Sequence, residues 1–160
     1  MDGGALITEQ AGEFRAGLPE GGVLLGLDLG TKTIGTAFCD ARWSFATAGK
    51  TLPRGKFARD KAALEALIAD RGARGIVIGL PLNMDGSGGP RAQASRAFAR
   101  NLAPLGLPVL LWDERWSTAT AERDMIAQDF SRAKRAERID SHAAAVILQA
   151  AIDRLAGGII

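Results

Sequence analysis

The sequence predicts a mixed α/β fold in which an antiparallel part comes first and a parallel part follows. Two apolar runs, 23–29 and 33–39, are joined by only three residues, which favours an antiparallel hairpin. Two further apolar runs, 76–80 and 109–112, alternate with helical patterns. Strand–helix alternation indicates right-handed crossovers and therefore parallel strands. We expect all of these strands to share one sheet with helices on its faces.

The first half of the chain holds two more elements. After a turn at 40–42, residues 43–51 are expected to form a third strand beside the hairpin. Residues 56–71 carry apolar side chains at helical spacing, and Gly72 is placed to end that helix. With this third strand included, the sequence predicts a mixed sheet of five strands.

Helices are also expected between and after the two parallel strands. The loop 81–89 is rich in turn-forming residues, and Pro90 suits the first position of the helix that follows. Ser117 or Thr118 is placed to cap a further helix. We expect the last helix to span 140–155, with apolar side chains along one side.

Length and composition fit one globular domain. The 160 residues are 47% hydrophobic, and we expect 22–156 to be a single domain preceded by a flexible leader at 1–21. A net charge of +2 neither requires nor excludes nucleic acid. The single cysteine excludes an internal disulfide. Because the chain also has only one histidine, a structural zinc site is not expected. No run is apolar enough to cross a membrane and no signal pattern is present, so we expect a cytoplasmic protein.

Four carboxylates stand inside or at the ends of predicted elements. They are Asp28 inside the first strand, Asp113 and Glu114 at the end of the fifth strand, and Asp140 at the start of the last helix. Ligands of open α/β sheets gather at the carboxyl ends of the strands. Carboxylates brought together there repel one another unless divalent cations offset their charge, and Mg²⁺ or Mn²⁺ prefer such oxygen ligands. The hypothesis is Mg²⁺- or Mn²⁺-dependent hydrolysis of phosphodiester bonds.

Each carboxylate also has a structural interpretation. Asp28 stands close to a glycine turn, Asp113 and Glu114 suit a solvated strand end, and Asp140 suits a helix N-terminus. Adjacent strand residues face opposite sides of a sheet, so we expect only one of Asp113 and Glu114 to bind metal. The residues alone do not say which of the two it is.

Polar and basic residues near these carboxylates are candidates for contacts with a phosphate backbone. Glycine turns let backbone N–H groups approach phosphate, and helix N-termini attract anions. The basic run 132–138 is interpreted as a mobile loop that closes on a polynucleotide, and a solvated charged surface is its alternative. The candidates are Thr31, Lys32, Asn83, Ser87, Arg91, Arg115, Arg132, Lys134 and Arg135.

Four motifs together resemble the YqgF family of bacterial proteins, also called RuvX. The matching segments are 26–35, 77–99, 113–122 and 140–149, which span roughly 23–153 in the family's order. The run Gly-Leu-Pro-Leu-Asn-Met-Asp-Gly-Ser at 79–87 is specific when it occurs with Asp-Glu-Arg-Trp-Ser-Thr at 113–118. The chain departs from the family pattern at Trp116 and His142, where aliphatic residues are common.

The resemblance implies an RNase H-like sheet with strand order 3-2-1-4-5, flanked by helices. It implies a nuclease that matures the 5′ end of precursor 16S ribosomal RNA, with Holliday junction resolution as the alternative. By the same resemblance, Asp28, Asp140 and either Glu114 or Asp113 form a metal-binding acidic set. We expect a nucleic acid as the partner, with precursor ribosomal RNA favoured over structured DNA. We expect the protein to be a monomer or a homodimer.

Two other functional classes stay open at this point. The pattern Asp-Leu-Gly-Thr at 28–31, with Gly35 following, is also similar to the phosphate-binding hairpin of sugar kinase and actin-like ATPases. Those proteins bind ATP between two such domains, and this chain has room for one. The second alternative is a nucleic-acid-binding module without catalysis. The filled acidic positions favour an active nuclease over both.

Overall fold

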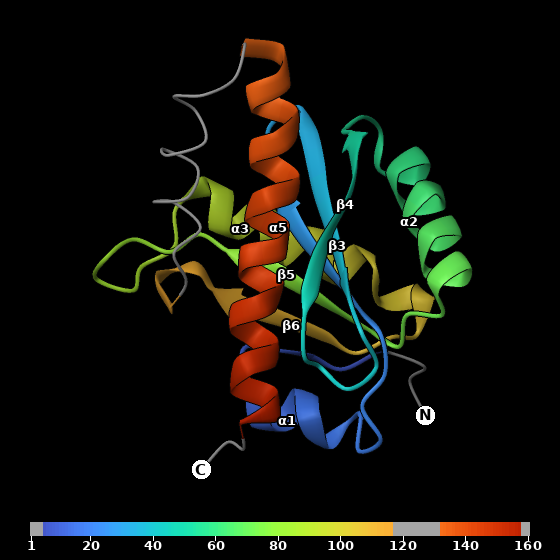
Figure 1. Ribbon diagram of the computed structural model, residues 1–160. Helices are drawn as coiled ribbons and strands as arrows, with labels where there is room; N and C mark the ends of the chain where they lie inside the picture. The colour runs from blue at the N-terminus through green and yellow to red at the C-terminus, as the bar shows by residue number, and fades with distance from the viewer. Residues whose placement is uncertain (1–4, 117–131, 158–160) are drawn as a thin grey trace.

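A six-stranded mixed sheet forms the middle layer of the molecule, in the order β1-β6-β5-β2-β3-β4 (Figure 1). The computed structural model describes residues 5–116 and 132–157, and for residues 116 and 132–140 it describes the backbone alone. β3 is antiparallel to its neighbours β2 and β4, whereas β2, β5, β6 and β1 are mutually parallel. The strands are β1 (Ile7–Thr8), β2 (Leu24–Leu29), β3 (Thr33–Cys39), β4 (Ala46–Pro53), β5 (Gly75–Leu80) and β6 (Val109–Asp113).

Helices cover both faces of this sheet. The long helix α5 and the short helix α1 pack on one face, and α2 and α3 pack on the other (Figure 1). None of the described helices is long and apolar enough to span a membrane. The helices are α1 (Ala11–Ala16), α2 (Phe57–Arg71), α3 (Pro90–Asn101) and α5 (Arg132–Ala156), with 3₁₀ turns η1 (Ala103–Leu105) and η2 (Glu114–Trp116).

Alternation along β2 determines which side chains meet which helices. Leu24 belongs to the core beneath α5, and Leu25 belongs to the core beneath α2 and α3. Gly26 faces α5 at close range, because a Cβ at this position would lie 2.9 Å from Leu148 Cβ. Successive strand residues point to opposite faces, so Asp28 lies on the α5 face, two residues beyond Gly26.

The predicted five-stranded arrangement is confirmed, with one addition. In chain order, β2 to β6 follow the expected 3-2-1-4-5 arrangement, and β1 extends the sheet beside β6. The third predicted strand begins at Ala46 instead of residue 43. The reason is Trp43, which adopts a left-handed backbone with φ 62° and donates its indole N–H to the Gly22 carbonyl oxygen at 2.8 Å.

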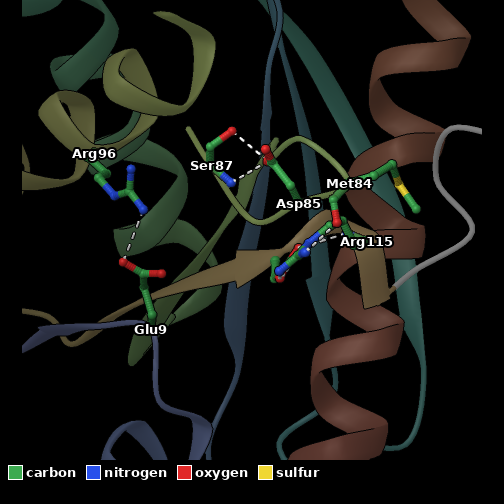
Figure 2. A network of polar contacts seen from close by, with 7 residues as sticks. Glu9, Met84, Asp85, Ser87, Arg96 and Arg115 are labelled. Carbon is green, nitrogen blue, oxygen red and sulfur yellow. Dashed lines mark hydrogen bonds and ion pairs between the residues drawn. The ribbon is translucent and has the colours of Figure 1, made fainter. Parts of the chain in front are cut away.

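The structure corrects the expectation of a flexible leader at 1–21 for residues 5–21, the part of this segment that it describes. Ile7 pairs with Val109 in β1, and Phe14 on α1 is fully buried in the core beneath α5. Glu9 forms an ion pair of 3.3 Å with Arg96 on α3 (Figure 2). The glycine-rich composition concealed this packing because a two-residue strand and a six-residue helix leave little periodic signal.

The structure also corrects the start of the last helix. α5 begins at Arg132, so Asp140 lies inside the helix and the basic run 132–138 is helical instead of a loop. Alanine, arginine, lysine and glutamate are strong helix formers, and their propensity prevails here over the capping tendency of Asp140. The helix expected after Ser117 or Thr118 lies outside the described residues.

Candidate functional site

Asp28 is a buried carboxylate on the α5 face of the central strand. Only 1% of its surface is exposed, and it pairs in register with Gly35 on β3. Leucine residues flank it along β2, so the chain places a carboxylate within an apolar strand, as the sequence predicted. A buried carboxylate is costly without compensating interactions, which makes this position a candidate for a cation ligand.

Glu114 lies on the same face as Asp28, directly over Gly79 of β5. A Cβ built on Gly79 would lie 2.9 Å from Glu114 Oε2 and 2.7 Å from Ile147 Cδ1 of α5. The last parallel pair between β2 and β5 is Leu27 with Ile78, so Asp28 and Gly79 are the next neighbours along the two strands. Gly79 thus leaves the space in which the Glu114 side chain approaches the Asp28 strand.

Asp113 lies on the opposite face and is bound to Arg115. It pairs in register with Leu80, which belongs to the core beneath α2 and α3. The Asp113 carboxylate accepts hydrogen bonds from Arg115 Nε at 3.1 Å, from Nη2 at 2.7 Å and from the Arg115 backbone N–H at 2.9 Å. The structure therefore separates the two adjacent carboxylates: Glu114 lies on the Asp28 side, and Asp113 holds an arginine.

Arg115 connects the end of β6 to the loop between β5 and α3. Its Nη1 donates to the Met84 carbonyl oxygen at 3.1 Å, beside Asp85 in the same loop (Figure 2). Burial alone would raise the pKa of Asp113, but the hydrogen bonds from Arg115 outweigh it and hold that pKa below its usual range. The same hydrogen bonds raise the pKa of Arg115. The pair therefore stays charged and fixes the loop beside Glu114.

Asp140 is placed by its backbone within α5. It stands one helical turn before Ala144, whose carbonyl oxygen would lie 3.3 Å from a Cβ at Gly26. The next residue, Ser141, is buried and hydrogen-bonds Thr51 of β4. Among the side chains that the structure describes, which exclude that of Asp140, no group of three or more His, Cys, Asp or Glu could hold a metal ion.

The candidate substrate residues divide into exposed and internally bonded groups. Thr31 and Lys32 are exposed in the β2–β3 turn. Arg91 is exposed at the start of α3, and its Nη2 donates to the Leu29 carbonyl oxygen at 3.3 Å. Asn83 and Ser87 instead hydrogen-bond each other at 3.0 Å, so their side chains stabilise the β5–α3 loop. Ser87 also donates to Asp85 at 2.6 Å (Figure 2), which holds the pKa of Asp85 low. Arg132, Lys134 and Arg135 lie in the first turns of α5.

Two residues at this edge of the sheet were missed by sequence reasoning. Gly79 carried a usable signal, because an isolated glycine inside an apolar strand indicates close approach of another group. Arg54 carried none: it follows β4, and its Nη1 donates to the Gly30 carbonyl oxygen at 2.7 Å, just beyond Asp28.

Comparison with known proteins identifies the family. A family model described as "RuvX: Holliday junction resolvase" matches residues 22–154. The chain belongs to the RuvX family. It is 70% identical over 152 residues to a protein of Novosphingobium aromaticivorans named "Putative pre-16S rRNA nuclease", covering 95% of this chain and 98% of that protein. A protein of Sphingopyxis alaskensis with the same name is 67% identical, with 94% and 99% of the two chains covered.

Solved structures support the RNase H-like fold of this RuvX protein. RuvC of Thermus thermophilus, solved in complex with a Holliday junction substrate, aligns with a TM-score of 0.52 at 13% identity. The alignment covers 84% of this chain and 96% of that chain. The predicted family and fold class are confirmed, and so is the predicted class of enzyme, a nuclease that hydrolyses phosphodiester bonds.

Proposed function

We propose that this RuvX protein is a divalent-metal-dependent nuclease that processes the 5′ end of precursor 16S ribosomal RNA in the cytoplasm. The observation that carries the proposal is the shared face of Asp28 and Glu114 at the carboxyl ends of β2 and β6. RNA of this kind is named as the substrate of relatives 70% and 67% identical to the chain. Asp28, Glu114 and Asp140 are the proposed catalytic carboxylates.

The donor set fits a hard divalent cation. Asp28 is a carboxylate with 1% exposure, and Glu114 lies over the adjacent strand on the same face. Oxygen ligands of this kind suit Mg²⁺ or Mn²⁺, and neutralisation by such an ion offsets the cost of keeping both groups charged. Asp28, Glu114 and Asp140 would hold the metal. When bound, the metal would activate a water and stabilise the leaving oxygen of the phosphodiester.

The protein's own side chains position the substrate strand in this proposal. Thr31 and Lys32 project from the turn that follows Asp28, where a backbone phosphate would approach the carboxylates. Asp113 acts indirectly, because it orients Arg115 and through it the loop at Met84. Contacts of this kind go to phosphate and position a strand without reading its sequence.

Cleavage of precursor 16S RNA with and without Mn²⁺ tests the proposal. Asp28→Asn and Glu114→Gln should each reduce the cleavage rate by about 10³-fold or more while leaving the fold intact. Asp113→Asn should retain much more activity, and Asp140→Asn should lose it. Asp153→Asn is the matched control, since Asp153 is an exposed carboxylate on α5. Metal-independent cleavage, or full activity of Asp28→Asn, would contradict the proposal.

Holliday junction resolution is the second candidate, favoured by the description of the family model. A four-way DNA junction in the same assay distinguishes the two substrates. Replacing Arg132, Lys134 and Arg135 by glutamine should weaken binding of the true substrate and reduce the dependence of affinity on salt. An unchanged salt dependence would remove these three residues from the substrate surface. Sedimentation of the free protein would decide between a monomer and a homodimer.

A further inference from the structure

An open pocket lies between the β2–β3 turn and the start of α3. Its volume is about 180 Å³, several times the roughly 30 Å³ that one water occupies in the liquid, so a phosphate group fits. Gly30 and Thr31 line one side, and Arg91 and Ser95 of α3 line the other. Arg54, from the connection after β4, joins them.

Two arginines in this pocket are anchored by the turn that follows Asp28. Arg54 Nη1 donates to the Gly30 carbonyl oxygen at 2.7 Å, and Arg91 Nη2 donates to the Leu29 carbonyl oxygen at 3.3 Å. The Arg54 guanidinium carbon also lies 5.6 Å from the centre of the Phe98 ring. Each guanidinium has five N–H donors, so most of them stay available after these contacts. Both arginines are therefore held in place while several of their N–H donors remain available to bind a ligand.

Among the residues that the structure describes, no acidic residue lines this pocket, and neither Arg54 nor Arg91 forms an ion pair. Asp60 lines an adjacent hollow together with Arg54, but its carboxylate forms no ion pair with Arg54 and accepts hydrogen bonds from the Gly55 N–H at 3.1 and 3.2 Å. The partial positive charge of the α3 N-terminus adds to that of the two guanidinium groups. Planar guanidinium donors match phosphate oxygens in geometry, so the chemistry of the pocket favours a phosphate.

The pocket lies behind the turn, on the other face of the sheet from the candidate metal site. Asp28 faces α5, whereas Leu29 belongs to the core beneath α2 and α3. A phosphate held by Arg54 and Arg91 is therefore a different one from the phosphate that would lie against Asp28. The backbone of residues 28–30 connects the two positions, so we expect one nucleic-acid strand that crosses the β2–β3 turn to contact both.

We propose that this pocket binds a non-scissile backbone phosphate of the substrate strand and that Arg54 and Arg91 are its positioning residues. The proposal rests on the proposed function, because it assigns the direction in which the strand leaves the carboxylates. It predicts that the two arginines act on one particular phosphate, displaced from the cleaved bond toward α3.

Binding of single-stranded RNA from the precursor 16S 5′ region tests this, with Asp28→Asn present throughout to prevent cleavage. Arg54→Gln and Arg91→Gln should each weaken binding about 10-fold or more and lower the slope of log affinity against log salt by about 0.7. Arg54→Lys should recover only part of the affinity, because lysine keeps the charge without the planar fork. Arg100→Gln, at the exposed far end of α3, is the matched control and should bind like the parent.

Neutral methylphosphonate links, placed one at a time along the RNA, locate the phosphate. At one link near the cleaved bond, the loss of binding free energy caused by Arg54→Gln and the loss caused by the methylphosphonate should not add. At all other links the two losses should add. Additive losses at every link, or equal losses for Arg100→Gln, would overturn the proposal. Competition by inorganic phosphate that disappears in Arg91→Gln would support it and show that free phosphate also enters. Cleavage by the parent enzyme is measured separately. Cleavage of the RNA without an effect of the arginine variants would contradict the pocket alone, whereas no cleavage by the parent would contradict the proposed function.

Discussion

Replacing Gly79 by alanine tests the placement of Glu114 with a single methyl group. The added Cβ would lie 2.9 Å from Glu114 Oε2 and 2.7 Å from Ile147 Cδ1, where ordinary contact begins at 3.4 Å. The carboxylate must therefore retreat by about 0.5 Å and the Ile147 methyl group by about 0.7 Å. Ile147, on α5, is fully buried and has little room to move. The new methyl group therefore cannot shift toward Ile147, and the Glu114 carboxylate has to move away from it.

We expect a moderate loss of stability and a larger loss of function. Overpacking of a well-filled core costs about 1–3 kcal/mol, and urea unfolding should show a decrease in the free energy of unfolding of that size. A catalytic group displaced by about 1 Å can cost about 10²-fold in rate, so a shift of half that size should slow cleavage by about 10-fold. The measurement is the cleavage rate at saturating RNA and Mn²⁺.

A second substitution separates the two effects. Ile147→Val removes Cδ1 and with it the closer of the two contacts, but the contact with Glu114 remains. Gly79→Ala with Ile147→Val should therefore regain part of the stability and little of the cleavage rate, and Ile147→Val alone should cleave normally. An unchanged rate in Gly79→Ala, or a rate that recovers together with stability in the double variant, would refute the placement of Glu114.

Two further predictions concern features that hold the site and the N-terminus. The lowered pKa of Asp113 means that its pairing with Arg115 stabilises the fold above the ordinary carboxyl pKa of about 3.9 and that this contribution is lost as the pH falls through the lowered value. Arg115→Gln should therefore lower the Tm more at pH 6–7 than at a pH below the lowered pKa of Asp113, and an equal difference at both pH values would contradict this. Phe14→Ala should cost about 3–5 kcal/mol in urea unfolding, because Phe14 is fully buried, and a flexible leader would show no change.

Local pattern was sufficient for most of the fold. The strand at 33–39 and the α2 end at Gly72 were predicted to the residue, because an apolar run and a glycine that ends a helix are features of neighbouring residues. The N-terminal helix was missed, since Phe14 is buried by contact with α5 and not by any pattern within its own six-residue helix. The start of α5 was placed at Asp140, eight residues late, because a good capping residue resembles a helix start even inside a helix.

The sequence by itself determined the family and the presence of Asp28 in an apolar strand, because both depend on short runs of contiguous residues. The order of the strands followed from the resemblance to the family. Only the tertiary structure decided that Glu114, and not Asp113, shares the face of Asp28. That choice depends on the register of β5 and β6 and on the space left by Gly79, a residue distant in the chain. Tertiary structure likewise brought Arg54 beside Arg91 through two carbonyl oxygens of the β2–β3 turn. Contacts of this kind, between residues distant in the chain, depend on packing between elements, which no local pattern of residues encodes.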